Sequence, residues 1–286
     1  ILFIVSFIFA VMLTLGYKTK VATIASWFLL ISLHNRNPAV LQGGDILFRV
    51  LLFFAIFLPL EKSFSLDAKK KKDKKNYLIF SVFTIGLIFQ IIFFYLFTAF
   101  LKTGSEWWPD GTAIYYALSI DQFTTHFGYF VYQFPLFMKF LTYFILFYWY
   151  IGPFLLLIPF LFSEIRMAVI SIFIFLQAGM SLSMRLGLFP LIAIVAMLPL
   201  IPGEFFSNFR KFKSNKIYFI KSDFFSLRSI IFTILGIFFI VYILFWNLQT
   251  LNLYNMPYDL ERVGYFLRID QKWNMFSPRP LTDDGW

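Results

Sequence analysis

Long runs of apolar residues recur along this chain, and they constrain its fold more than any other feature. Each run is about 20 residues long, the length that crosses the hydrocarbon core of a bilayer as a helix. The chain is 60% hydrophobic and only 14% charged, unlike a soluble domain. Because no alternating ten-residue pattern indicates a membrane barrel, the sequence predicts an all-α, polytopic membrane protein in a lipid bilayer.

We predict a single transmembrane domain over residues 1-286. Its eight spans are expected near 1-15, 20-33, 46-60, 77-101, 135-162, 166-183, 187-202 and 228-249. The positive-inside rule assigns the basic loops, including the run Lys69 to Lys75, to the cytoplasm. The loop 102-134 and the tail 250-286 are then extracytoplasmic. This asymmetry accounts for the net charge of +10, so the charge does not indicate a nucleic-acid partner.

The stretch from Leu101 to Leu118 is the best candidate for chemistry, because a long apolar run stops there and becomes a polar, aromatic loop. Lys102 comes directly after the fourth span. A lysine at such a position usually extends its amine to the membrane interface, and nearby tryptophans usually belong to the aromatic belt. The alternative is that Lys102 is part of a functional site.

The rest of this loop has recognisable local signals. Pro109, Asp110 and Gly111 indicate a turn, and Thr112 is a candidate cap for a helix that starts at Ala113. Residues 113-132 fit a pair of short helices in the interface better than another span. His126 is a candidate acid or base, although the sequence identifies no partner for it.

A second polar feature lies in the third span, where Arg49 follows Asp45 by four residues. Residues at this spacing share one face of a helix, and a charge inside the membrane is costly unless it is paired. We therefore predict an Asp45–Arg49 ion pair, either structural or part of a site. In the tail, apolar residues at helical spacing predict a helix that ends before Pro278.

Several classes of site are excluded by residue type. The chain has no cysteine and two histidines, His34 and His126, so we expect no disulfide, thiol catalysis or metal centre. No phosphate loop, dinucleotide fingerprint or serine-nucleophile elbow is found. A transporter has little support, because we find no internal repeat.

Three segments together resemble the horizontally transferred transmembrane (HTTM) family, which is related to vitamin K-dependent γ-glutamyl carboxylase. The segments are HNRNPAVLQGGDILFRVLLFFAIFLPL from His34 to Leu60, KTGSEWWPDGTAIYYAL from Lys102 to Leu118, and QKWNMFSPRP from Gln271 to Pro280. In the carboxylase, a lysine five residues before a tryptophan is the active-site base. Lys102 and Trp107 have that spacing.

The resemblance implies a membrane oxidoreductase in which Lys102 deprotonates a reduced quinone of the vitamin K or menaquinone type, which then reacts with O2 and ends as an epoxide. Burial lowers the pKa of a lysine, so this role is chemically reasonable. In the carboxylase the reaction also adds CO2 to glutamate. The implied pocket comprises Asp45, Arg49, Trp107, Trp108, Tyr115, Tyr116, His126 and Trp273.

Two departures favour quinol oxygenation over glutamate carboxylation. The carboxylase has an Asn-His pair in the stretch that corresponds to Gly43-Gly44-Asp45, where this chain has Asp45 and no histidine, and His34 is too far upstream to be called equivalent. We also expect no room in residues 1-286 for the large exoplasmic domain that recognises protein substrates. The alternative function is a non-catalytic membrane partner or maturation factor for a secreted peptide, with Lys102 as an interface residue.

Overall fold

The computed structural model describes residues 1–62, 65–70, 76–78, 81–158, 163–203, 205, 217–219 and 227–281. Residues 71 to 75 of the predicted basic run lie outside the described residues. The described chain is almost entirely helical, which confirms the all-α prediction. It forms two compact units, and the division falls inside helices α5 (Val82–Phe100) and α12 (Leu227–Thr250). Unit 1 holds Ile1–Gln90, Lys211–Trp246 and Asn255–Asp270, and unit 2 holds Ile91–Arg210, Asn247–Tyr254 and Gln271–Trp286.

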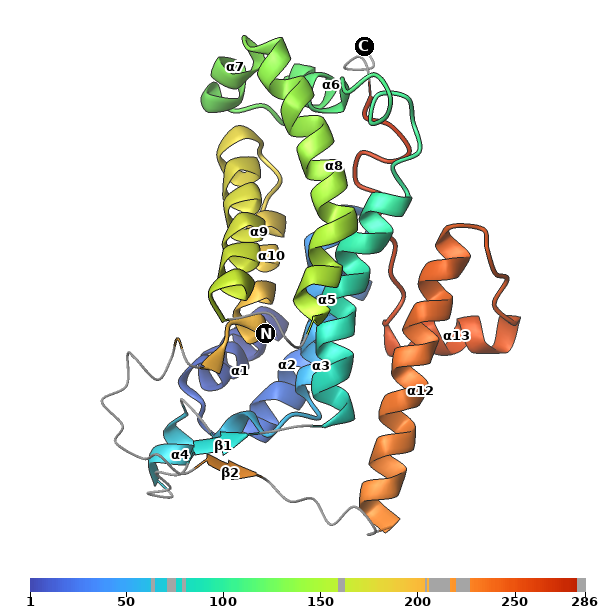
Figure 1. Ribbon diagram of the computed structural model, residues 1–286. Coiled ribbons are helices and arrows are strands. Elements are labelled where there is room, and N and C mark those ends of the chain that lie inside the picture. Colours follow the sequence, from blue (N-terminus) through green and yellow to red (C-terminus); the bar gives the residue numbers. More distant parts are fainter. Residues whose placement is uncertain are drawn as a thin grey trace. The chain divides into compact units, whose positions relative to one another are not determined.

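Each predicted span contains a helix (Figure 1). These are α1 (Leu2–Leu15), α2 (Thr19–Arg36), α3 (Gly43–Ala55), α5 (Val82–Phe100), α8 (Pro135–Leu157), α9 (Ser163–Ser183), α10 (Phe189–Met197) and α12 (Leu227–Thr250). In the described part of the chain, four helices are long and apolar enough to cross a membrane: α5, α8, α9 and residues Ser229–Thr250 of α12. The protein is therefore a membrane protein, and the count of eight spans stays a prediction.

The other elements are short. They are η1 (Pro38–Val40), η2 (Leu60–Lys62), α4 (Leu66–Lys70), α6 (Ala113–Ser119), α7 (His126–Tyr132), η3 (Leu198–Leu200), α13 (Tyr258–Leu267) and the strands β1 (Asn76–Leu78) and β2 (Ile217–Phe219). The strands pair in parallel, with Tyr77 opposite Tyr218. The predicted span 77-101 thus begins in β1, and its helix starts only at Val82.

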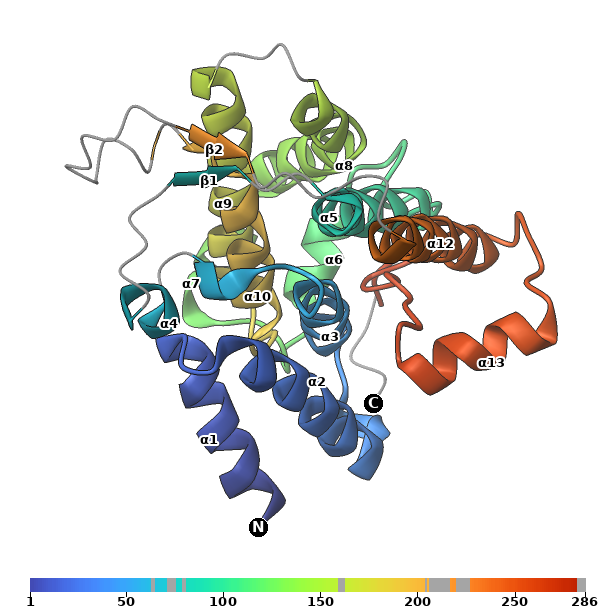
Figure 2. The same ribbon diagram turned by 90° about the horizontal axis from the view of Figure 1, so that it is seen from below.

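In unit 1, α1 lies beside α2 and α2 lies beside α3 (Figure 2). The start of α2 is fixed by Asp67, whose carboxylate accepts hydrogen bonds from the Thr19 amide and hydroxyl, both at 2.8 Å. Phenylalanines of α3 and α12 form part of the core, with Phe53 and Phe239 ring centroids 4.8 Å apart. The predicted tail helix is confirmed as α13, and it packs on α12 through a hydrogen bond from the Tyr242 hydroxyl to the Leu260 carbonyl at 2.8 Å.

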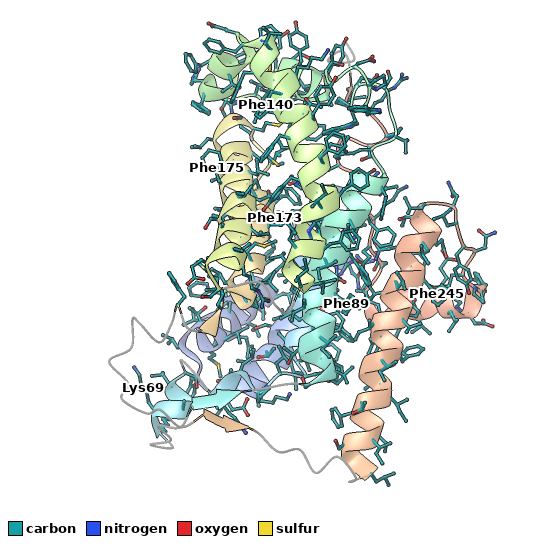
Figure 3. The ribbon with its side chains drawn as sticks, viewed as in Figure 1. Lys69, Phe89, Phe140, Phe173, Phe175 and Phe245 are labelled. Atoms are coloured by element: carbon teal, nitrogen blue, oxygen red, sulfur yellow. The ribbon has the colours of Figure 1, made fainter. Side chains whose placement is uncertain are left out.

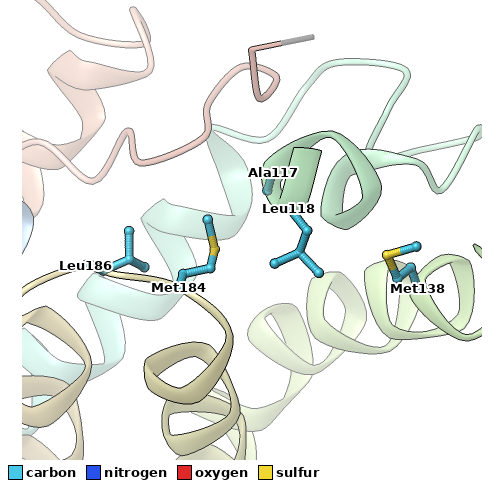
Figure 4. Close-up of a cluster of buried hydrophobic side chains, with 5 residues drawn as sticks. All are labelled: Ala117, Leu118, Met138, Met184 and Leu186. Carbon is cyan, nitrogen blue, oxygen red and sulfur yellow. The ribbon is translucent and has the colours of Figure 1, made fainter. Parts of the chain in front are cut away.

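In unit 2, α9 packs against both α8 and α10, and the predicted helix pair α6 and α7 lies at one end of α8 and α9 (Figure 1). Thr112 is the N-cap residue of α6 but makes no side-chain capping hydrogen bond, so its predicted capping role is wrong. A buried apolar cluster joins α6 to α8 and to the segment after α9 (Figure 4). Its members are Ala117, Leu118, Met138, Met184 and Leu186.

One face of α9 packs against other helices, and another face is exposed. Phe173 is fully buried and its ring centroid lies 4.3 Å from that of Tyr95 on α5, whereas Phe175 is 74% exposed (Figure 3). An exposed phenylalanine of this kind is expected on a helix that faces lipid. The aromatic residues of unit 2 therefore serve both helix packing and the membrane surface.

Two helical glycines of unit 2 give a test of this packing. A Cβ at Gly152 would lie 2.7 Å from Phe173 Cζ, whereas a Cβ at Gly179 would meet nothing within 4 Å. We expect Gly179→Ala to raise the free energy of unfolding by up to about 1 kcal/mol, because alanine has the higher helix propensity. We expect Gly152→Ala to lower it by about 1–3 kcal/mol, because the added methyl group overpacks the contact with Phe173. Thermal unfolding in detergent micelles measures both, and equal effects of the two substitutions would contradict the described α8–α9 packing.

Candidate functional site

The site is built around Lys102, which follows the last turn of α5. Its amide donates to the Ala99 carbonyl at 3.0 Å, which continues the turn for two residues beyond Phe100. The Lys102 side chain is only 5% exposed. Protein groups therefore enclose it, which is not expected of a lysine that extends its amine to water.

The C-terminal tail holds the Lys102 amine. Lys102 Nζ donates to the Met275 carbonyl at 2.8 Å and lies 3.3 Å from Ser277 Oγ, which accepts a second hydrogen bond. The Phe276 carbonyl between them accepts from Trp107 Nε1 at 3.1 Å. Three successive tail residues are thus bound to the lysine and to its neighbouring tryptophan.

Further contacts dock the tail on the loop that follows Lys102. The Gly104 amide donates to the Pro278 carbonyl at 3.0 Å, and Arg279 Nη1 lies 3.8 Å from Glu106 Oε1. A side chain at position 104 would meet Arg279 Cβ at 2.9 Å and the Pro278 carbonyl oxygen at 3.0 Å, so the close approach requires glycine. The loop after Lys102 and the tail therefore pack against each other beside the lysine.

Two tryptophan rings face the same amine. Lys102 Nζ lies 4.4 Å from the ring centroid of Trp107 and 5.2 Å from that of Trp149 on α8. Both tryptophans are buried. An aromatic face attracts a cation, but the rings also exclude water from it.

Burial decides the ionisation of this amine. Desolvation lowers the pKa of Lys102 to about 7, because the ammonium loses its hydration. Among the described residues, no carboxylate forms an ion pair with it. The loss of hydration therefore favours the uncharged amine, which can accept a proton.

A hydrogen bond between α8 and the end of α5 fixes where Lys102 lies along α8. The Tyr150 hydroxyl donates to the Ala99 carbonyl at 3.1 Å, so the end of α5 lies beside residues 149 and 150. Trp149 is 14 residues from Pro135, about 21 Å along a helical axis. The lysine therefore lies beside a middle part of α8, which is a candidate membrane span.

The other predicted pocket residues of unit 2 have different surroundings. Trp108 is 58% exposed and packs edge-on against Tyr143, while His126 is exposed at the start of α7. Tyr115 stacks on Tyr132 at 4.6 Å and contacts Tyr116 edge-on. Trp273 is buried, and its Nε1 donates to Gln271 Oε1 at 3.1 Å. Of the predicted wall residues, Trp107 has its ring beside Lys102 Nζ.

Unit 1 contains a polar cluster around Arg49. Arg49 is 1% exposed, and its Nη2 donates to the Asp270 carbonyl at 2.9 Å and to Asp270 Oδ1 at 3.1 Å. Asp45 instead accepts from the Gln42 amide at 2.8 Å in a capping box that starts α3. The predicted Asp45–Arg49 ion pair is therefore wrong. The Asp45 carboxylate caps α3, and Arg49 instead forms its ion pair with Asp270 of the tail.

His34 joins this cluster. Its Nε2 lies 3.9 Å from Asp45 Oδ1, and its side chain is buried at the end of α2. Burial lowers the pKa of His34, the charge of Arg49 acts in the same direction, and Asp45 opposes them. Although 11 positions separate them, the six-residue connection 37–42 between two helices brings His34 and Asp45 together.

A family model described as HTTM domain matches residues 1–204. The chain belongs to the HTTM family. This domain is associated with vitamin K-dependent carboxylase-like membrane proteins. Comparison with curated proteins finds no match. Comparison with solved structures likewise finds none.

Sequence reasoning missed several residues of this HTTM protein. Met275 and Ser277 hold Lys102 and Asp270 holds Arg49, yet all three lie beyond the matched region. The tail segment 271-280 carried a resemblance, which could have pointed to it, but only Trp273 was selected. Trp149 sits in the apolar run FILFYWYIG and gave no polar signal.

The contacts of Arg49 predict that Asp270 contributes more to stability than Asp45. Asp270→Asn removes the charge that compensates a fully buried guanidinium, so we expect the HTTM protein to lose about 3–5 kcal/mol of stability. Asp45→Asn is the matched control, since its side chain is 38% exposed and only a capping contact is weakened, at about 1 kcal/mol. Thermal unfolding of both variants measures these losses of stability. A loss for Asp45→Asn as large as that for Asp270→Asn would contradict the assignment of Asp270 as the partner of Arg49.

Proposed function

We propose that this HTTM protein is a membrane oxidoreductase that oxygenates a reduced quinone of the vitamin K or menaquinone type, with Lys102 as the general base. The observation that carries the proposal is the buried Lys102 amine, which lies among tryptophan rings and tail acceptors and has a pKa of about 7. A base is most effective when its pKa is close to the operating pH.

The surroundings of Lys102 support a lipid-soluble substrate. The amine lies beside the interior of α8, and α5 and α8 are both candidate membrane spans. A quinol can reach a buried site beside such helices through the bilayer, whereas a water-soluble substrate would need a polar route. The aromatic faces of Trp107 and Trp149 suit a planar aromatic head group.

The residues of the chain would each do a defined part of this reaction. Lys102 Nζ takes the hydroxyl proton of the quinol and becomes an ammonium, which Met275 O and Ser277 Oγ then stabilise as acceptors. Trp107 and the tail keep water from the amine. The quinol supplies the electrons: one atom of O2 ends in the epoxide and the other in water.

The alternative function, a non-catalytic partner that binds a secreted peptide, would make Lys102 an interface residue. Its 5% exposure does not favour that role. Extracytoplasmic orientation of the loop 102-134 belongs to the proposal and rests on the charge asymmetry of the sequence. Asp45 and Arg49 as polar anchors of the same pocket stay a prediction.

An epoxidation assay tests the proposal. Protein in liposomes with reduced menaquinone and O2 should form the epoxide, and Lys102→Ala should lower the rate by about 100-fold or more because the base is lost. Lys102→Arg should also be inactive, since a guanidinium does not release its proton. The wild-type rate should rise with pH through about 7, as the ammonium becomes the amine.

Lys139→Ala is the matched control for this assay, because Lys139 is an exposed lysine of α8. It should keep the wild-type rate. Epoxide formation by Lys102→Ala at the wild-type rate would remove Lys102 as the base, and absence of epoxide in every sample would reject the proposed reaction.

A further inference from the structure

The exposed face of α13 is rich in aromatic rings. Phe266 is 84% exposed and Tyr258 is 72% exposed, and Tyr265 is exposed as well. The exposed Arg262 lies beside them, with its guanidinium carbon 5.6 Å from the Tyr258 ring centroid. Tyrosine is enriched at the boundary between a membrane and water, and phenylalanine with basic residues is typical of helices that lie in that boundary. The composition of this face therefore fits a lipid surface.

Another side of α13 is fixed to α12 within unit 1. The Tyr242 hydroxyl donates to the Leu260 carbonyl at 2.8 Å. Gly264 is buried against Trp246, and a Cβ at this position would collide with the indole ring. Figures 1 and 2 both show α13 crossing α12 rather than running along it. A helix that crosses a membrane span in this way lies roughly parallel to the membrane plane.

The contact with α13 lies near one end of α12. Tyr242 and Trp246 precede Thr250, the last residue of α12, by about 12 and 6 Å along the helical axis. The candidate span Ser229–Thr250 has 22 residues and is about 33 Å long, close to the thickness of a bilayer core of about 30 Å. The end of α12 therefore lies near the boundary of the core when α12 crosses the bilayer.

The exposed side chains of α12 continue beside this contact. Val241 and Phe245 directly precede Tyr242 and Trp246, and both are exposed. Exposed apolar residues on a candidate membrane span are expected to face lipid. The outward face of α13 thus borders a lipid-facing surface of the same unit, which favours lipid over a soluble partner.

We propose that α13 lies in the headgroup region of the phospholipid bilayer and binds its surface. Tyr258, Tyr265 and Phe266 place their rings at the boundary of the acyl chains, where the apolar surface leaves water. The Arg262 guanidinium donates hydrogen bonds to lipid phosphate oxygens, which match its planar fork of donors. The inference does not depend on the reaction proposed for Lys102.

Lipid contact gives α13 a role in positioning the tail. Asp270 lies three positions after Leu267, the last residue of α13, and its carboxylate accepts from Arg49 Nη2 at 3.1 Å. The membrane surface and Arg49 thus hold the two ends of this short segment of unit 1.

Spin labelling of the full chain in phospholipid liposomes tests the inference. The chain has no cysteine, so Phe266→Cys provides the only attachment site for a nitroxide. O2 is enriched in lipid and a nickel chelate stays in water, so the ratio of their collision rates with the nitroxide reports its depth. We expect the label to lie about 5–10 Å below the lipid phosphates, with O2 collisions favoured over nickel collisions.

Two exposed positions calibrate this depth. Phe238→Cys places the label on the middle of α12 and is the lipid reference, and Lys69→Cys places it in the basic segment α4 and is the water reference. Tyr258→Cys repeats the measurement on α13 and carries the test if Phe266→Cys does not fold.

Two results would overturn the inference. Nickel collisions as frequent as those of Lys69→Cys would place the exposed face of α13 in water. Rare collisions with both reagents would show that protein, such as a second copy of the chain, covers this face. Neither result bears on epoxide formation, because none of these labels replaces a residue that contacts Lys102.

Discussion

Desolvation of a single amine, that of Lys102, is the constraint on which the proposed chemistry depends. A lysine next to a membrane helix would ordinarily reach water, and its four-carbon stem is long enough to do so. Here the tail supplies two acceptors and two tryptophan rings fill the surroundings, so the side chain stays buried. The cost of burying the ammonium appears as the lowered pKa of Lys102.

The C-terminal tail completes a polar contact in each unit. Asp270 compensates Arg49 in unit 1, and Met275 with Ser277 holds Lys102 in unit 2. These tail residues lie outside residues 1–204, the region that matches the HTTM domain. Arg49 of α3 and Lys102 after α5 are thus two buried basic groups, and a later segment of the chain provides the groups that accept their hydrogen bonds.

Much of the fold follows from local sequence. Apolar runs predict the helices of all eight expected spans, and the turn at Gly111 and the polar breaks after it predict α6 and α7. Helix formation needs only neighbouring residues, so these predictions succeed. Length limits the spans, because α3 has 13 residues and covers about 20 Å of a bilayer core about 30 Å thick.

The partners within the site follow from tertiary contacts that local sequence does not contain. Lys102 and Met275 are 173 positions apart, and Arg49 and Asp270 are 221 apart. The helical spacing of Asp45 and Arg49 suggested a pair, but a capping box competes for Asp45. Spacing identified Lys102 and Trp107, whereas the position of Trp149 beside the Lys102 amine is visible only once the helices are packed.

The most direct measurement is the titration of Lys102 itself. NMR of the isotope-labelled protein in micelles gives the pH midpoint of the Lys102 titration without any substrate. The Lys102→Met variant assigns the signal. We expect a midpoint near 7 for the burial described. A midpoint near about 10.4, where a hydrated lysine titrates, would contradict it.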